Sequence, residues 1–399
     1  MKAATIDFYD PDRFVDSVPF DDFHWLRQNE PVYFNPQDDG PGFWNLTRYD
    51  DVVAASRDYA TFSSAKGTNI DDMQGGVELM MVNIDPPKHT KLRALVRTGF
   101  TPKRVAALEV HVRDIATRIV DGVARRGECD FVTEVAAELP LQVIAEMIGV
   151  PEEDRRKIFD WSNTMIGLDD PEYGSSVEIA TQAAMEMYAY WDDLGKERRA
   201  DRREDLVTAL VEAELDGQQL SDLEIDVFLL LLAVAGNETT RNLVSHGLKM
   251  LNDNPEQRER LVSDPGLLPL AVEEMLRMAT PVMHFRRTAT KDVEVGGREI
   301  KEGQKVLLWY ISGNRDEEVF PEPDRFDAGR TPNEHLGFGG GGPHFCLGAN
   351  LARLEIRVMF EELFRRFPDI EIAGPVPRLR SNFINGLKHM PVRFTPERA

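Results

Sequence analysis

Residues 338–353 read FGGGGPHFCLGANLAR, and the rest of the chain is best understood around this stretch. Four consecutive glycines and then Pro343 exclude an ordinary helix or strand, because glycine adopts backbone angles closed to other residues and proline has a fixed φ and no N–H. A helical pattern begins at Ala349, so Cys346 lies just before a predicted helix N-terminus. Backbone N–H groups and the positive end of a helix favour a thiolate at such a position.

Two interpretations of Cys346 follow from this local pattern. A lone cysteine beside glycines is most often a small buried hydrophobe next to a flexible loop. The second interpretation is a metal ligand. Proteins ligate haem iron through the sulfur of a thiolate that lies among N–H donors, in a loop that lets a large flat group approach. The motifs elsewhere in the chain decide between the two.

A second motif places polar side chains inside an apolar helix. Residues 229–240 read LLLLAVAGNETT, and the apolar residues surround this segment almost completely, which predicts a buried helix. Gly236 costs such a helix about 1 kcal/mol relative to alanine, and the Glu238-Thr239-Thr240 sequence brings an acid and hydroxyls into the core. The ordinary interpretation is a hydroxyl that bonds back to a helix carbonyl. The functional interpretation is a proton path made of an acid and an alcohol.

Composition limits the class of protein. The chain has 399 residues, a net charge of −22 and a pI of about 4.8, which argues against nucleic acid or an anionic membrane surface as the main partner. No apolar run is long enough to span a membrane, and the N-terminus lacks a signal pattern. The two cysteines, Cys129 and Cys346, indicate a reducing compartment and cannot build a Cys₄ metal site. We therefore expect a cytoplasmic protein with no membrane segment.

The hydrophobic pattern predicts a mostly helical chain with small sheets near both ends. Predicted helices cover residues 23–27, 50–57, 104–126, 141–148, 155–166, 179–199, 221–250, 255–264, 267–278 and 349–367, and one more helix opens at 85–87 and carries His89 and Arg93. Predicted strands cover residues 31–34, 43–47, 293–300, 305–310 and parts of 371–394, and residues 63–84 are expected to form a long irregular loop.

Taken together, these motifs resemble those of a bacterial cytochrome P450, a haem-thiolate monooxygenase, in the family's order along most of the chain. One departure is that Phe338 lies eight residues before Cys346, one residue farther than in the commonest family pattern. Members that hydroxylate sterol side chains, methyl-branched lipids and terpenoids look similar here and in AGNETTRN (235–242), RRTAT (286–290) and WYISGNRDE (309–317). The resemblance implies the family's triangular, mainly α prism with small β-sheets, as one domain over residues 1–399. Haem would lie between the long central helix and the helix after the cysteine loop.

The resemblance also assigns a cofactor, heme b, to a set of residues. Cys346 is the metal ligand, and Phe338 and Gly348 belong to the same cysteine loop. Basic side chains are expected at the two haem propionates, because a buried carboxylate needs cationic or N–H partners. These side chains are His89, Arg93, Arg287 and His344, with Arg286 as a rival to Arg287.

Two further sets of residues receive roles from the resemblance. Ala235 and Gly236 are expected to open a groove where the long helix bulges, and Glu238 and Thr239 are the catalytic acid and alcohol. An ion-paired brace near the cysteine loop is expected from three charged side chains, Glu274, Arg277 and Arg325. The role of this brace is structural.

The implied partners are a hydrophobic small-molecule substrate, O₂, and a ferredoxin with its ferredoxin reductase. The electron donor is expected to be separate because no GxGxxG fingerprint lies between a strand and a helix. The predicted docking patch for an acidic ferredoxin comprises Lys91, Arg97, Lys103, Arg104, Arg353 and Arg357. The predicted substrate pocket is apolar and Met-rich, with Met73, Leu79, Met80, Met81, Met165, Met185, Met187, Leu231, Val234, Met283, Phe285, Phe383 and Ile384 as candidates.

Two other functions remain open at this point. One is a haem-thiolate sensor or carrier that binds ligands without turnover, and the other is a peroxide-driven peroxygenase. The intact Glu238-Thr239 pair speaks against both. The favoured hypothesis is insertion of one oxygen atom of O₂ into a terminal or near-terminal C–H bond of a steroid side chain, branched fatty acid or terpenoid.

Overall fold

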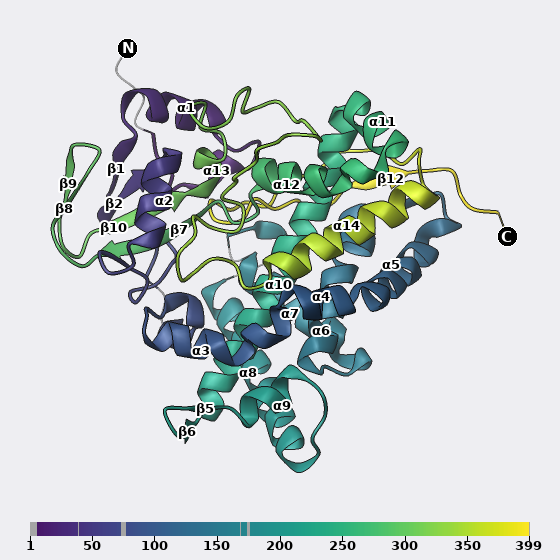
Figure 1. Ribbon diagram of the computed structural model, residues 1–399, viewed down its shortest axis with the longest axis horizontal. Coiled ribbons are helices and arrows are strands. Elements are labelled where there is room, and N and C mark those ends of the chain that lie inside the picture. Colours follow the sequence, from purple (N-terminus) through teal and green to yellow (C-terminus); the bar gives the residue numbers. More distant parts are fainter. Residues whose placement is uncertain (1–5, 39, 73–76, 168, 174–175, 399) are drawn as a thin grey trace.

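The structure, a computed structural model, describes residues 6–38, 40–72, 77–167, 169–173 and 176–398. The main sheet lies on one side of the molecule, and helices make up most of the rest (Figure 1). The main sheet has the strand order β1-β2-β10-β7-β3, in which β10 runs parallel to β2 and the other neighbours are antiparallel. Its strands are β1 (Val32–Gln37), β2 (Gly40–Leu46), β3 (Phe62–Ser63), β7 (His284–Ala289) and β10 (Lys305–Trp309).

Smaller sheets lie outside the main one. A three-stranded sheet has the order β11-β12-β4, and two hairpins pair β5 with β6 and β8 with β9. Their strands are β4 (Glu128–Asp130), β5 (Glu214–Leu215), β6 (Gln218–Gln219), β8 (Val293–Val295), β9 (Arg298–Ile300), β11 (Glu371–Ile372) and β12 (Pro391–Arg393).

Helices form the larger part of the molecule, as the hydrophobic pattern predicted. They are α1 (Phe20–Asn29), α2 (Tyr49–Arg57), α3 (Lys88–Arg97), α4 (Pro102–Ala107), α5 (Glu109–Ala124), α6 (Glu138–Ile148), α7 (Arg155–Ile166), α8 (Val177–Ala200), α9 (Leu206–Val211), α10 (Asp222–Asp253), α11 (Pro255–Ser263), α12 (Leu268–Ala279), α13 (Tyr310–Gly313) and α14 (Ala349–Arg366). Short 3-10 turns connect them at η1 (Pro11–Phe14), η2 (Val77–Leu79), η3 (Met81–Asn83), η4 (Thr98–Phe100), η6 (Glu152–Asp154), η7 (Pro171–Tyr173) and η8 (Pro265–Leu267), with a π-helical turn at η5 (Val132–Ala136).

One predicted helix is wrong, because residues 104–126 do not form a single helix. The chain instead makes α4 and α5, which meet at Leu108. The Leu108 N–H donates to the Val105 carbonyl at 3.0 Å, a tight closing turn, and Thr101 caps the start of α4. Neither Gly nor Pro marks this break, so the apolar pattern runs through it without a signal.

The central helix α10 is held by close packing on several sides (Figure 1). A capping box of Ser221 and Glu224 fixes its start, and most of its side chains are buried. A Cβ on Gly247 would lie 2.7 Å from the Phe360 ring of α14 and 2.8 Å from the sulfur of Met275 in α12. Glycine there lets α10, α12 and α14 approach closely, which places the helix after the cysteine loop directly against α10.

A buried ion pair braces α12 against the loop that precedes the cysteine. The Arg277 guanidinium makes two hydrogen bonds of 2.8 Å to the Glu274 carboxylate, and both side chains have no exposed area. The third member of the brace is Arg330, at 3.0 Å from Glu274. The expected member, Arg325, is exposed and pairs with Glu322 instead. Both arginines lie in one loop, and sequence spacing alone does not tell which of them turns inward.

None of the helices in the described part of the chain is both long and apolar enough to cross a bilayer.

Candidate active site

The cysteine loop is shaped by its glycines and lies against α2. Gly339, Gly341 and Gly342 have φ values of 96°, 88° and 74°, in the left-handed region that favours glycine. A Cβ on Gly342 would lie 2.6 Å from the carbonyl oxygen of Ser56, so the loop also needs glycine for its close approach. The Cys346 N–H donates to the Phe338 carbonyl at 3.0 Å and closes the loop.

Backbone N–H groups and two arginines lie around the Cys346 sulfur. Its side chain is accessible, yet enough protein surrounds it that burial raises the thiol pKa. The N–H groups of Gly348 and Ala349 at the start of α14 oppose that rise, as do the charges of Arg93 and Arg353. Gly348 is the N-cap residue of α14, which explains why these N–H groups are free to face the sulfur.

Basic side chains from three separate segments converge beside the cysteine loop. His89 and Arg93 come from α3, Arg287 from β7 and His344 from the loop itself, and the two histidine rings lie 4.3 Å apart. Burial lowers the pKa of His344, and the charges of Arg287, His89 and Arg93 lower it further. Burial and Arg93 lower the pKa of His89 to about 4.

This basic cluster lacks an acidic partner within the described residues. Neither Arg93 nor Arg287 forms an ion pair there, although Arg287 is only 2 % exposed, and the Nδ1 atom of His89 has no hydrogen-bond partner. Asp85 is close enough to affect Arg287 and His89, but it accepts hydrogen bonds from Ser63 and Ser64 instead. Arginines without counter-charges, beside histidine rings that can donate an N–H, suit an anionic ligand, so these residues fit the two carboxylates of a haem.

Arg286, the alternative to Arg287 as a haem-carboxylate partner, is already bonded to other residues. It pairs with Asp72 at 2.6 Å and donates to the carbonyls of Gly67 and Ile70 at 3.2 Å each. Neighbouring residues on a strand point to opposite faces, so Arg286 and Arg287 cannot both reach the cysteine side of β7. The structure therefore favours Arg287.

The acid and the alcohol lie on the central helix, but the expected bulge is absent. α10 is regular through the motif, and the Thr239 hydroxyl donates to the Ala235 carbonyl at 2.8 Å. Ala235 is exposed and Thr239 partly so, which gives α10 one accessible face within an otherwise buried helix. Gly236 is partly accessible beside Ala235, and a Cβ there would lie 3.2 Å from Ile144 of α6, so glycine also permits close packing of α10 against α6.

Glu238 is almost fully buried beside this face, with 1 % of its area exposed. One carboxylate oxygen pairs with Arg241, and the other has no partner among the described residues. Burial raises the pKa of Glu238, and the Arg241 charge opposes the rise. A carboxyl with a raised pKa suits proton delivery near neutral pH.

Sequence reasoning missed two polar residues that bear on this site. Glu355 on α14 is 3 % exposed. Burial raises its pKa to about 8, although a hydrogen bond with Thr240 opposes the rise. Arg241 on α10 is 5 % exposed and pairs with Glu238. An acid within the apolar stripe of a helix is a detectable signal for Glu355, whereas the pairing of Arg241 needed the structure.

The Met-rich pocket is the weakest part of the predicted site. Met187 and Met283 are fully buried in packed cores, Met81 is nearly so, and Met185 is 59 % exposed on the outside of α8. Met73 lies outside the described residues. Phe285 and Phe383 are partly buried with ring centroids 5.7 Å apart, and Leu79, Met80, Leu231 and Val234 are also partly accessible.

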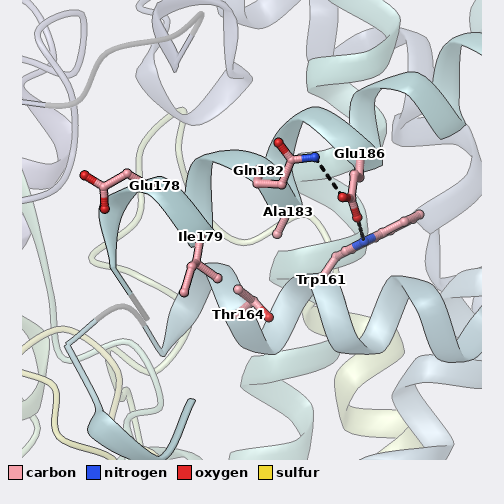
Figure 2. A pocket seen from close by; sticks show the side chains of 7 residues that line it. All are labelled: Trp161, Thr164, Glu178, Ile179, Gln182, Ala183 and Glu186. Carbon is pink, nitrogen blue, oxygen red and sulfur yellow. Dashed lines mark hydrogen bonds between the residues drawn. The ribbon is translucent and has the colours of Figure 1, made fainter. Parts of the chain in front are cut away.

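A separate surface pocket of about 360 Å³ lies between α7 and α8 (Figure 2). Its lining contains none of the predicted site residues. Glu186 accepts hydrogen bonds from Trp161 and Gln182, each at 2.8 Å, so its carboxylate is already occupied.

Three of the six cations in the predicted docking patch form ion pairs within the chain. Lys91 pairs with Asp216, Arg353 with Glu273, and Arg357 with Glu109 and Glu361. The remaining cations, Arg97, Lys103 and Arg104, are exposed and form no ion pair among the described residues.

Comparisons with known proteins agree with this geometry. The cytochrome P450 family model matches residues 266–379. The methyl-branched lipid omega-hydroxylase of Mycobacterium tuberculosis is 45 % identical over 408 residues, which cover 99 % of this chain and 95 % of that protein. The steroid C26-monooxygenase of Rhodococcus jostii is 45 % identical over 405 residues, covering 97 % of this chain and 84 % of that protein. A Mycobacterium marinum cytochrome P450 in complex with pseudoionone is 41 % identical, with a TM-score of 0.90 and 94 % of each chain covered.

The near-full-length relatives place this chain in the cytochrome P450 family, and its cysteine loop before a helix that packs against the long central helix agrees with that family. The chain is a cytochrome P450 monooxygenase, and membership of the family implies haem.

Proposed function

We propose that this monooxygenase hydroxylates the terminal or near-terminal carbon of a branched apolar chain, as found in a steroid side chain, a methyl-branched fatty acid or a terpenoid. The observation that carries this proposal is the near-full-length identity of 45 % with relatives named for omega- and C26-oxidation. A long apolar guest gains about 25 cal/mol per Å² buried, which supplies the binding energy for end-on entry. Positioning must then favour a primary C–H bond over weaker tertiary ones.

Each residue of the site has a role in this proposal. Cys346 holds heme b through its sulfur, and a haem with a thiolate ligand supplies the oxidant that inserts one oxygen atom into a C–H bond. His89, Arg93, Arg287 and His344 bind its carboxylates. Thr239 and Glu238 hold and deliver protons at the accessible face of α10, and the aromatic side chains of Phe285 and Phe383 exclude water from the substrate.

Electrons are supplied by a separate ferredoxin and its reductase in the cytoplasm. Arg97, Lys103 and Arg104 are exposed and form no ion pair with any residue that the structure describes. They follow His89 and Arg93 along the chain, at the end of α3 and the start of α4. In a chain with net charge −22, a local basic patch favours an acidic partner. Product formation with NADH and a ferredoxin system, compared with peroxide alone, separates this function from a peroxygenase.

The substrate class is tested by a spectral titration. Cholest-4-en-3-one, a methyl-branched fatty acid and a monoterpene alcohol are each titrated into the ferric protein, and at least one is expected to shift the iron from low to high spin. A compact polar aromatic compound serves as the control and is expected to leave the spectrum unchanged. If none of the three lipids shifts the spin state of the iron and the aromatic compound does, the lipid proposal is contradicted. The assignment to the monooxygenase class is unaffected by that result.

Replacing Thr239 by alanine is expected to lower the product formed per NADH by on the order of tenfold, because oxygen is then held without an ordered proton path. Haem and substrate binding should remain. Thr181→Ala is the matched control, since Thr181 makes the same bond to a carbonyl one turn earlier, at 2.7 Å, on the exposed face of α8. If the two variants form the same amount of product per NADH, Thr239 has no role in the mechanism.

A further inference from the structure

A buried guanidinium lies inside the loop that follows β3, and the loop is called the cation loop below (residues 64–72). The Arg286 side chain of β7 has 1 % of its area exposed. Its side-chain donors reach three backbone carbonyl oxygens of this loop, those of Lys66, Gly67 and Ile70, the last two at 3.2 Å each. The Arg286 backbone N–H also donates to the Thr68 carbonyl at 2.7 Å. The cation loop is therefore wrapped around one cation.

A carboxylate and a second cation complete this arrangement on its solvent side. Asp72 pairs with Arg286 at 2.6 Å and with Lys305 of β10 at 3.3 Å, and 70 % of the Asp72 side chain is exposed. The Lys305 ammonium donates to the Ile70 carbonyl at 2.9 Å. Backbone carbonyls and a carboxylate are the oxygen ligands that bind metal cations such as calcium in other proteins. In this chain an arginine side chain fills such a set of oxygens.

Gly67 shows that the cation loop is built for this close approach. Its φ is 98°, in the left-handed region that favours glycine. A Cβ at this position would lie 3.2 Å from a terminal nitrogen of Arg286. A side chain on residue 67 would therefore strain the backbone and press on the guanidinium.

The cation loop joins the haem side of the proposed site to the predicted substrate pocket. At its start, the Ser64 hydroxyl lies 3.2 Å from Nε2 of His344, one of the proposed partners of the haem carboxylates. Farther along, the Thr68 hydroxyl donates to the amide oxygen of Asn83 in η3 at 2.9 Å. The neighbouring turn η2 ends at Leu79, a partly accessible pocket candidate, and packs against α10. A fixed cation loop thus helps to fix a segment of the pocket.

We propose that Arg286 is a positioning residue for the substrate pocket, a built-in cation that holds the cation loop and, through it, the segment with Leu79 and Met80 against α10. The inference rests on the proposed function for the kind of guest that this segment contacts. Arg287, the next residue on β7, points to the other face of the strand and is the proposed partner of the haem carboxylates. Two adjacent arginines therefore have different tasks, one toward the cofactor and one toward the pocket.

The first test measures the cation loop without any substrate. Hydrogen–deuterium exchange of the haem-loaded protein is followed by mass spectrometry in peptides that contain residues 64–72. In Arg286→Ala the exchange rate is expected to rise about tenfold, because the loop loses its charge-assisted hydrogen bonds to the guanidinium. Millimolar guanidinium ion should restore slow exchange by taking the place of the missing side chain. Urea, which has a similar shape and no charge, and NaCl at the same concentration should not.

Three further variants sharpen this test. Arg298→Ala is the matched control, since Arg298 of β9 pairs with Glu30 on the surface at 2.8 Å, and it should leave exchange in the cation loop unchanged. Arg286→Lys should restore part of the protection, because lysine keeps the charge and lacks the planar set of donors. Gly67→Ala leaves Arg286 in place and should raise the exchange rate severalfold, so it tests the same contact if Arg286→Ala does not fold.

The second test compares a large guest with a small one. The Kd of cholest-4-en-3-one, measured by its spin-state shift, is expected to rise about tenfold in Arg286→Ala, because a loosened pocket segment must be ordered again on binding. Imidazole binds the iron directly and is too small to need that segment, so its Kd should stay at the wild-type value, as should the reduced CO spectrum. Guanidinium ion should lower the steroid Kd in Arg286→Ala and not in the wild type. A general loss of structure would change all of these readouts together.

The outcomes separate this inference from the proposed function. Wild-type exchange in Arg286→Ala, or in Gly67→Ala if the first variant does not fold, overturns the role of Arg286. Faster exchange with an unchanged steroid Kd also overturns it, because the cation loop then has no bearing on the pocket. A wild-type protein that gives no shift with cholest-4-en-3-one contradicts the steroid part of the proposed function. In that case the exchange rates still decide on Arg286, since the first test uses no substrate.

Discussion

Replacing Cys346 by alanine is expected to abolish the thiolate-type spectrum of the reduced CO complex and all monooxygenation. The backbone N–H groups of Gly348 and Ala349 face this sulfur, and no other cysteine lies in the loop. In the proposed site, His89, Arg93, Arg287 and His344 would still hold the haem carboxylates, while the sulfur ligand would be lost. The variant should therefore still bind haem, measured by its pyridine complex, while product formation falls to the background rate.

Cys129→Ala is the matched control for this prediction. Cys129 lies in β4, paired with Val392 of β12, and burial raises the pKa of its thiol to about 12. Such a thiol stays protonated at neutral pH and is not a ligand for iron. The control is expected to keep the wild-type CO spectrum. If Cys346→Ala retains that spectrum instead, the ligand assignment is wrong.

Replacing Glu274 by alanine is expected to lower the free energy of unfolding by about 3–5 kcal/mol, because one partner of a buried ion pair is removed and the other is left uncompensated. In this protein the substitution removes further interactions in addition to the ion pair. Arg277 has no exposed area, and the hydrogen bonds from Arg330 and from Asn333 to the same carboxylate, at 3.0 and 3.1 Å, also disappear. Chemical denaturation of the haem-loaded protein measures the change.

The control for the Glu274 variant lies in the same loop region. Glu322 pairs with Arg325 at 2.8 Å on the surface, so Glu322→Ala removes a similar ion pair that is exposed. Its expected cost is about 0–1 kcal/mol. Equal effects of the two substitutions would show that burial of Glu274 contributes nothing to the stability of the brace.

The parts of the fold and site that sequence predicts are those in which local chemistry has few alternatives. Glycine and proline fix the loop before Cys346, and an acid with hydroxyls in an apolar helix marks Glu238 and Thr239. The Ser221 cap and the apolar pattern give the start and the course of α10. In each of these segments the local conformation is set by residues that are adjacent in sequence.

The parts that sequence does not predict depend on contacts between distant segments. Arg325 and Arg330 are equally able to pair with Glu274, and the turn of the loop alone selects Arg330. Met185 and Met187 are two residues apart on α8, yet one is exposed and the other fully buried, which the composition of a Met-rich stretch does not reveal. The tie from Arg241 to Asn163 similarly joins two helices whose separation in sequence is large.

The order of strands in the main sheet has a consequence for synthesis on the ribosome. β1 and β2 are made early, but β2 completes its pairing only with β10, whose Lys305 lies opposite Phe43. Pairing of such distant segments is slow, because a long loop must close first. The early hairpin therefore emerges with the β2 edge still unpaired, and an open strand edge is a template for misassociation between nascent chains. The chain must leave the exit tunnel as far as Trp309, which is about three quarters of its length, before that edge is covered.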